Sequence, residues 1–191
     1  MADWQIVLVR HGETEWSRDG RHTGVTDIPL TEAGRKQAAA LRPQLDNRRF
    51  TLVLTSPLQR AEETCRLAGF AGQAKPRPEL KEWDYGTYDG LTSAQIRARR
   101  PDWSLWRDGG PGGESPAEVG HRVDRVLAEA RSAGGDVLLF AHGHVLRVLA
   151  ARWLEQPPEA GRFYALGTAA WSVLGHEHDE PVIEHWNLRP A

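Results

Sequence analysis

Three short, mainly apolar runs recur along the chain, and each one stops abruptly at polar residues. The runs cover residues 4–9, 51–55 and 136–141. Apolar runs of this length predict strands that are buried on both faces, as in a parallel sheet. Segments with apolar residues at helical spacing lie between them, so we expect an α/β fold with a mostly parallel sheet and right-handed crossovers.

Helix signals place most of the remaining elements. Thr31 is a predicted N-cap, and the helix that it opens must end or bend at Pro43. A second helix follows the second strand and ends at Gly69. Capping boxes, in which Thr or Ser is followed three residues later by Gln or Glu, predict further helix starts at Thr92 and Ser115.

The rest of the chain shows weaker patterns. Residues 13–29 are polar and turn-forming, which predicts a long functional loop, and residues 74–80 are predicted to be extended. Alternating positions at 171–174 and 182–186 predict two closing strands, which would form a hairpin at the sheet edge.

Length and composition narrow the class of protein. The 191 residues suit a single domain, 1–191. A net charge of −2 argues against nucleic acid as a partner, and no run of apolar residues is long enough to cross a membrane. With one cysteine, Cys65, no internal disulfide can form, so we expect a cytoplasmic protein. A homodimer is compatible with this sequence.

Charged and imidazole side chains follow the ends of the three predicted strands. Arg10 and His11 follow the first strand, Arg60 comes shortly after the second, and His142 follows the third. Because the carboxyl ends of parallel strands meet at one edge of a sheet, we expect these side chains to line one crevice. Two guanidinium groups and two imidazoles suit a doubly charged phosphoryl group.

His11 is the predicted nucleophile, since Gly12 lets the backbone approach closely and one ring nitrogen can donate to a main-chain carbonyl. Glu82 is the candidate proton donor, with aromatic neighbours whose partial burial of the carboxyl group would raise its pKa. This role predicts activity shifted to the acidic side, offset by the need for a neutral His11. Glu82 could instead be a surface carboxylate that pairs with Lys81 or with an arginine. No magnesium-type carboxylate cluster or Walker loop is present, so we expect no metal and no cofactor.

The segment Arg10-His11-Gly12-Glu13-Thr14 resembles the Arg-His-Gly-Glu/Gln-Thr/Ser signature of the histidine phosphatase superfamily, in its phosphoglycerate-mutase-like branch. Segments at 15–17, 23–24, 30–34, 56–61, 82–86, 113–115 and 141–143 extend the resemblance over most of the chain. It implies a three-layer α/β/α sandwich with a mostly parallel sheet.

The resemblance also implies a role for each matching residue. His11 would carry the phosphoryl group, Arg10, Arg60 and His142 would hold it, and Glu82 would donate the proton. The positions that would line the substrate pocket are Ser17, Thr23, Gly24 and Gly143.

Three departures favour a phosphatase over a cofactor-dependent phosphoglycerate mutase. The chain is shorter than such mutases, Ser17 stands where they usually carry Asn, and Asp108 stands where they usually carry a second arginine. The predicted function is metal-independent hydrolysis of a sugar phosphate or similar small phosphorylated metabolite through a phosphohistidine. A mutase is the alternative. A non-catalytic module that binds a phosphorylated ligand ranks lower, because a sensor has no need of Glu82.

Three further features bear on the site: a set of tryptophans, one more histidine and a polar turn near the end of the chain. Trp16, Trp83 and Trp106 are predicted to wall the pocket. His144 is more simply a helix cap or solvated than part of the pocket, and residues 176–179 form a solvated turn rather than a zinc site.

Overall fold

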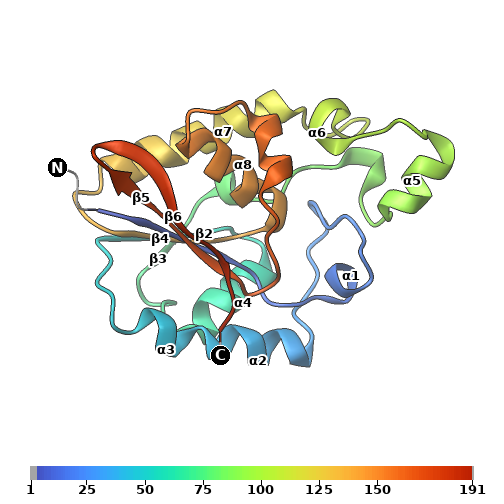
Figure 1. Ribbon diagram of the computed structural model, residues 1–191. Helices are drawn as coiled ribbons and strands as arrows, with labels where there is room; N and C mark the ends of the chain where they lie inside the picture. Colours follow the sequence, from blue (N-terminus) through green and yellow to red (C-terminus); the bar gives the residue numbers. More distant parts are fainter. Residues whose placement is uncertain (1–3, 191) are drawn as a thin grey trace.

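In the computed structural model, which describes residues 4–190, one mixed sheet lies between two layers of helices (Figure 1). The strand order is β3-β2-β4-β1-β5-β6. The strands are β1 (Ile6–Arg10), β2 (Leu52–Thr55), β3 (Ala74–Pro76), β4 (Val137–Ala141), β5 (Trp171–Glu177) and β6 (Glu180–Leu188). The predicted α/β fold is confirmed.

Strand pairing follows the sequence pattern at the centre of the sheet. The pairs β1–β4, β4–β2 and β2–β3 are parallel, whereas β5 and β6 add an antiparallel hairpin beside β1. The hairpin at the edge is as predicted. Strand β3 was predicted only as an extended segment, because three residues that end in proline give no buried-strand pattern. Its place at the sheet edge, where proline is tolerated, explains that weak signal.

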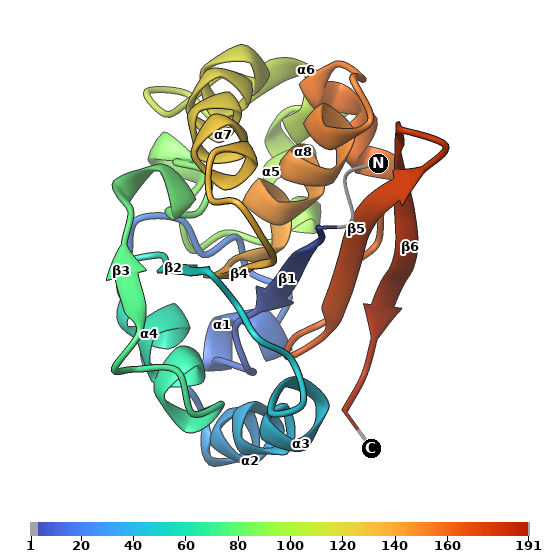
Figure 2. The same cartoon turned by 90° about the vertical axis from the view of Figure 1, so that its left-hand side faces the viewer.

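Helices α2 (Glu32–Ala40), α3 (Arg42–Leu45) and α4 (Gln59–Leu67) cover one face of the sheet. Helices α7 (Pro116–Arg131) and α8 (Gly143–Trp153) cover the other, as Figure 2 shows from a second side. The elements α1 (Glu15–Arg18), α5 (Ser93–Arg99), α6 (Leu105–Asp108) and the 3₁₀ segments η1 (Pro78–Leu80), η2 (Gly86–Tyr88) and η3 (Pro158–Phe163) complete the description.

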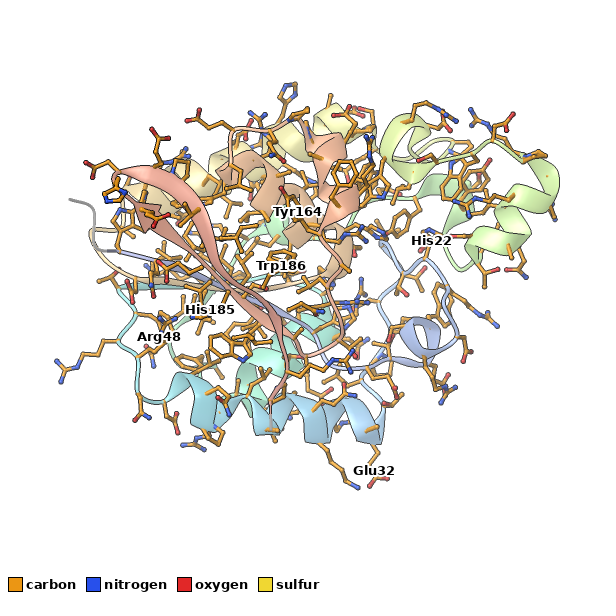
Figure 3. The ribbon with its side chains drawn as sticks, viewed as in Figure 1. His22, Glu32, Arg48, Tyr164, His185 and Trp186 are labelled. Atoms are coloured by element: carbon orange, nitrogen blue, oxygen red, sulfur yellow. The ribbon has the colours of Figure 1, made fainter. Side chains whose placement is uncertain are left out.

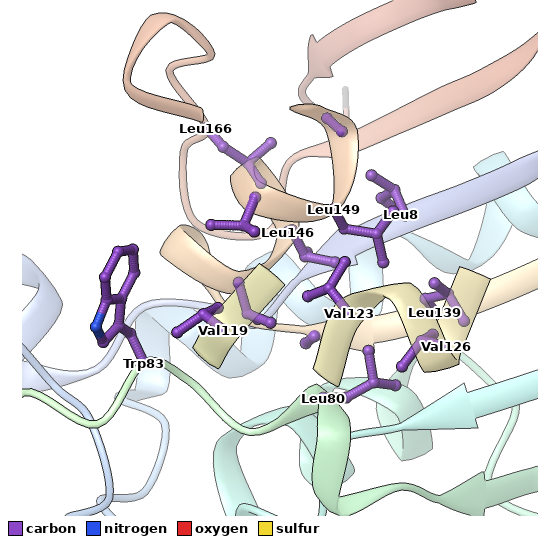
Figure 4. Close-up of a cluster of buried hydrophobic side chains, with 14 of the residues drawn as sticks. Leu8, Leu80, Trp83, Val119, Val123, Val126, Leu139, Leu146, Leu149 and Leu166 are labelled. Carbon is purple, nitrogen blue, oxygen red and sulfur yellow. The ribbon is translucent and has the colours of Figure 1, made fainter. Parts of the chain in front are cut away.

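Two apolar clusters explain why the central strands are apolar throughout. In β1, Ile6 and Leu8 belong to the cluster beneath α7 and α8, part of which Figure 4 shows. Val7 and Val9 belong to the second cluster, on the face of α2 and α4. Successive residues of a strand point to opposite faces, so a strand between two layers is apolar at every position.

The predicted helix starts are confirmed by hydrogen bonds. Thr31 Oγ1 accepts from the Gly34 N–H at 3.0 Å, and both predicted capping boxes, at Thr92 and Ser115, are present. The prediction of an unbroken loop at 13–29 is wrong, because α1 lies within it. Its capping box pairs Thr14 with Ser17 rather than with a glutamate or glutamine, so the usual pattern is missing from the sequence.

Candidate active site

A pocket of about 240 Å³ opens beyond the carboxyl ends of β1 and β4. Most of its lining residues come from the end of β1 and the loop after it, from the segment around Glu82 and from the first turns of α8. They are Arg10, His11, Ser17, Gly20, Arg21, His22, Thr23, Glu82, Tyr85, Ser93, Gly143, His144, Arg147 and Leu166. Six of the nine predicted site residues are therefore brought together in one pocket.

His11 is held in a single orientation and in one tautomer. It is 4% exposed, and its Nδ1 lies 2.7 Å from the Gly12 carbonyl oxygen. Because a carbonyl can only accept, Nδ1 must donate, which leaves the Nε2 lone pair free when the ring is neutral. Burial, followed by the charges of Arg60 and Arg10, lowers the His11 pKa well below 6.5 and keeps the ring neutral.

The backbone around His11 is fixed by contact between two glycines. A Cβ atom on Gly12 would lie 2.3 Å from the Gly34 carbonyl oxygen, and one on Gly34 would lie 2.1 Å from the Glu13 oxygen. The Gly12 N–H also donates to Thr64 Oγ1 on α4 at 3.0 Å. The close backbone approach expected at Gly12 is thus a contact between the turn after β1 and the first turn of α2.

Arg10 brings an unsatisfied donor to the pocket. One terminal nitrogen donates to the Leu166 carbonyl, whereas the buried Nε has no hydrogen-bond partner among residues 4–190. The backbone of Gly143 lies against this side chain, since a Cβ there would be 3.2 Å from the Arg10 Cζ. A buried cationic N–H without a partner costs free energy, and an anionic oxygen would satisfy it.

Arg60 and His142 do not line the pocket; both are fully buried beside His11. Arg60 Nε donates to His142 Nδ1 at 3.1 Å, so a neutral His142 carries its proton on Nε2, which lies 2.7 Å from Ser56 Oγ. The rings of His142 and His11 have centroids 5.2 Å apart. In this structure Arg60 and His142 thus lie buried beside His11, the predicted nucleophile.

Arg60 also fixes the loop that carries two of the predicted substrate residues. Its terminal nitrogens donate to the carbonyl oxygens of Thr23, Gly24 and Thr26 at 2.9–3.1 Å. Thr23 lines the pocket, whereas Gly24 is buried below it and does not. The buried arginine therefore sets the position of this loop.

The Glu82 carboxyl group is buried and does not pair with Lys81, so the surface reading is wrong. Oε1 accepts the N–H groups of Trp83 and Val145, both at 2.9 Å, and Oε2 accepts the N–H of His144 at 3.0 Å. Glu82 thus caps the N-terminus of α8, where no cap comes from His142. Oε1 has both acceptor positions filled, whereas Oε2 keeps one for a proton.

Several lining residues were missed or given little weight from the sequence. His144 lines the pocket rather than serving as a solvated cap, and Arg147, three residues later on α8, lines it too. Residues three apart on a helix share a face, so that spacing was the signal. None of the three predicted tryptophan walls lines the pocket: Trp83 is buried in the core, and Trp106 lies under the Arg147 guanidinium.

Arg122 on α7 holds the segment that carries Glu82, a role that the sequence did not reveal. Its guanidinium donates to both carboxylate oxygens of Glu114, at 2.7 and 2.9 Å. It also donates to the carbonyl oxygens of Glu79, Lys81 and Glu82 at 2.6–3.2 Å. All its donors are used inside the protein.

Replacing Arg122 with methionine should lower the free energy of unfolding by about 3–5 kcal/mol, because Glu114 and three carbonyl oxygens lose a charged partner. Arg125→Met is the matched control on the same helix, since the Arg125 side chain is 63% exposed and pairs only loosely with Glu79. Urea titration of both variants is the measurement. Equal losses would contradict the role of Arg122.

Four histidines around the pocket have a lowered pKa. They are His11, His22, His142 and His144, and burial is the largest cause for each. Below pH 6.5 the unfolded chain therefore binds more protons than the folded one. We expect the free energy of unfolding to fall as pH drops from 6.5 to 5, by up to about 1.4 kcal/mol per pH unit for each histidine. Urea titrations across this range test it, and a flat or rising stability would contradict it.

Within residues 4–190, no group of three His, Cys, Asp or Glu residues is placed to hold a metal ion, and residues 176–179 lie at the turn of the β5–β6 hairpin. Among the helices of the same described range, none is long and apolar enough to cross a membrane.

Comparison with known proteins agrees with this geometry. Residues 6–189 match the model of the histidine phosphatase superfamily (branch 1), so the chain belongs to that superfamily. It is a histidine phosphatase, a class of phosphoric monoester hydrolase for which a phosphohistidine mechanism is typical.

Named relatives include phosphatases and mutases. An acid phosphatase of Mycobacterium tuberculosis is 42% identical over 178 residues, which cover 91% of this chain and 87% of the relative. Sedoheptulose 1,7-bisphosphatase of Saccharomyces cerevisiae is 35% identical, with 78% and 67% covered. A 2,3-bisphosphoglycerate-dependent phosphoglycerate mutase of Gloeobacter violaceus is 34% identical, with 81% and 77% covered.

A solved structure extends the likeness to the whole fold. A protein encoded by an open reading frame of Mycobacterium tuberculosis superposes with a TM-score of 0.94 at 39% identity, over 98% of this chain and 99% of that one. The predicted three-layer phosphatase fold is thereby confirmed.

Proposed function

We propose that this protein hydrolyses a sugar phosphate or similar small phosphorylated metabolite through a phosphohistidine on His11. The observation that carries the proposal is the free Nε2 of a neutral, fixed His11 in the same pocket as the unpartnered Nε–H of Arg10. A nucleophile and a cationic donor in one pocket are what phosphoryl transfer requires.

In the proposed reaction, His11 Nε2 attacks phosphorus and the bond to the leaving-group oxygen breaks. That oxygen takes a proton from Glu82 Oε2. Water then attacks the phosphohistidine, Glu82 accepts a proton from it, and free phosphate leaves. Arg10 binds the phosphoryl oxygens, and Arg60 and His142 stay predicted ligands of the same group. Because the His11 pKa is low, His11 does not oppose activity on the acidic side.

Hydrolysis is favoured over mutase activity by what surrounds the pocket. Arg107 is tied to Asp108 through hydrogen bonds of 3.0 and 2.9 Å, and neither residue lines the pocket. Ser17 lines the pocket, but its Oγ is engaged by the backbone of Thr14, both as acceptor and as donor. At position 108, where mutases usually carry a second arginine, this chain therefore has no arginine to offer a substrate.

A panel of phosphorylated metabolites, assayed with a chelator and with a bisphosphorylated primer, tests the proposal. We expect free phosphate to appear faster than isomerised product, and at an undiminished rate in chelator. Faster isomerisation would favour the mutase, and binding without either product would favour the non-catalytic module. The single domain, the cytoplasmic location and a homodimer stay predictions from the sequence.

A further inference from the structure

The pocket is also lined by two imidazoles, those of His22 and His144, for which the proposed reaction has no use. The rings of His22 and His144 are stacked nearly parallel, with centroids 6.1 Å apart and an interplanar angle of 7°. Both residues line the pocket, and Figure 3 labels His22 on the loop after β1.

The tautomer of His22 is set by its backbone partner. Its Nδ1 lies 2.9 Å from the Leu91 carbonyl oxygen, which can only accept, so Nδ1 carries the proton. Burial lowers the pKa of His22, so the ring is neutral at pH 7. The Nε2 of His22 is therefore an acceptor, and within residues 4–190 the ring's hydrogen bond is the one from Nδ1 to Leu91.

The tautomer of His144 is set by Tyr85. The Tyr85 hydroxyl lies 2.6 Å from His144 Nδ1, and within the described residues it has no other hydrogen-bond partner. Tyr85 is 2% exposed, and burial raises its pKa well above 10, so the phenol keeps its proton and needs an acceptor. If His144 Nδ1 donated instead, the buried phenol O–H would have no acceptor, which is costly.

It follows that Tyr85 donates to Nδ1 of His144, so a neutral His144 carries its proton on Nε2. Burial and the charge of Arg147 lower the pKa of His144 well below 6.5, which keeps the ring neutral. The ring cannot turn freely, because Trp106 and Tyr85 pack edge-on against it, with centroids 5.4 and 5.8 Å away. The two rings thus present one fixed donor and one fixed acceptor.

We propose that His22 and His144 form a subsite for hydroxyl groups of the leaving alcohol, with His144 donating to one hydroxyl oxygen and His22 accepting from a hydroxyl O–H. The two rings are nearly parallel, so the N–H of His144 and the lone pair of His22 lie in separate, nearly parallel planes. A hydroxyl can donate or accept, so neighbouring hydroxyls on one alcohol can meet both needs. Tyr85 is the positioning residue. The subsite rests on the proposed function and narrows its substrate class to phosphate esters of polyhydroxy alcohols.

Two phosphate esters that differ only in hydroxyl groups test the subsite: glycerol 3-phosphate and propyl phosphate. We expect the protein to prefer glycerol 3-phosphate by at least about tenfold in kcat/KM. In His144→Phe and His22→Phe this preference should fall towards one, mainly through a higher KM for glycerol 3-phosphate. His185→Phe is the matched control, because His185 is exposed on β6 and outside the pocket. An unchanged preference in the two pocket variants would overturn the subsite.

The tautomers can be read without turnover from ¹⁵N shifts of the imidazole nitrogens in the intact protein. We expect His144 protonated on Nε2 and His22 on Nδ1, and a shift of His144 towards mixed tautomers in Tyr85→Phe. The opposite tautomer in either ring of the wild-type protein would overturn the inference. This test needs no variant, so it holds even where a variant does not fold. Hydrolysis of neither ester would contradict the proposed function alone, and the ¹⁵N tautomers would then decide the subsite.

Discussion

Replacing His11 with alanine should abolish hydrolysis of p-nitrophenyl phosphate, with a loss of at least about 10⁴-fold in kcat/KM. His11 Nε2 is the nucleophile in the proposed reaction, and it is fixed in the pocket that also holds Arg10. The neighbouring His142 cannot replace His11, because both nitrogens of the His142 ring are engaged. Arg60 donates to Nδ1 of His142, and Nε2 of His142 is hydrogen-bonded to Ser56. The loss should therefore be close to complete rather than partial.

The measurement is release of p-nitrophenol in the presence of chelator, together with acid quenching of the enzyme after mixing with ³²P-labelled substrate. The wild type should yield an acid-labile, base-stable phosphoenzyme, and His11→Ala should yield none. His185→Ala, an exposed histidine on β6, controls for the loss of an imidazole elsewhere. Substantial activity in His11→Ala would refute the phosphohistidine mechanism.

Replacing Glu82 with glutamine should slow formation of the phosphoenzyme by about 10²–10⁴-fold for an alkyl phosphate. An alkoxide is a poor leaving group and needs the proton that Oε2 can carry. For p-nitrophenyl phosphate the loss should be far smaller, because p-nitrophenolate leaves without protonation. The ratio between the two substrates isolates proton donation from general damage to the site.

Rapid-quench measurement of the phosphoenzyme burst provides these rates, separately from the later hydrolysis step. A glutamine NH₂ facing the His144 N–H also weakens the cap of α8, so thermal unfolding must be recorded for the variant. Glu177→Gln, at the exposed end of β5, is the matched control. Equal losses for both esters would refute Glu82 as the proton donor.

Regular elements were predicted well where the chain repeats a simple rule. Strands β1, β2 and β4 were recognised because burial on both faces requires apolar residues at every position, and α5 and α7 because their capping boxes are local in sequence. The elements that were missed, α1 and β3, are three or four residues long and depend on contacts with distant segments.

The candidate site likewise has features that the sequence predicted and features that it did not. The ends of the predicted strands pointed to Arg10, His11 and His142 as site residues from the sequence alone, because a parallel sheet gathers the carboxyl ends of its strands at one edge. The sequence also indicated that His11 would donate from one nitrogen to a carbonyl, a bond that depends only on the adjacent Gly12. These features are local, and local features can be read from the chain.

Only the tertiary structure decided which side chains face the pocket and which stand behind it. Arg60 is buried and donates to backbone carbonyl oxygens. Glu82 caps α8 by accepting from two N–H groups that lie 62 and 63 positions further along the sequence. The tautomers of His144 and His22 likewise arise because Tyr85 and Leu91, from distant segments, lie within hydrogen-bond distance of these two rings. The sequence thus determined the fold and indicated His11 as the candidate nucleophile, whereas the protonation and orientation of the side chains depend on partners that folding alone brings within hydrogen-bond distance.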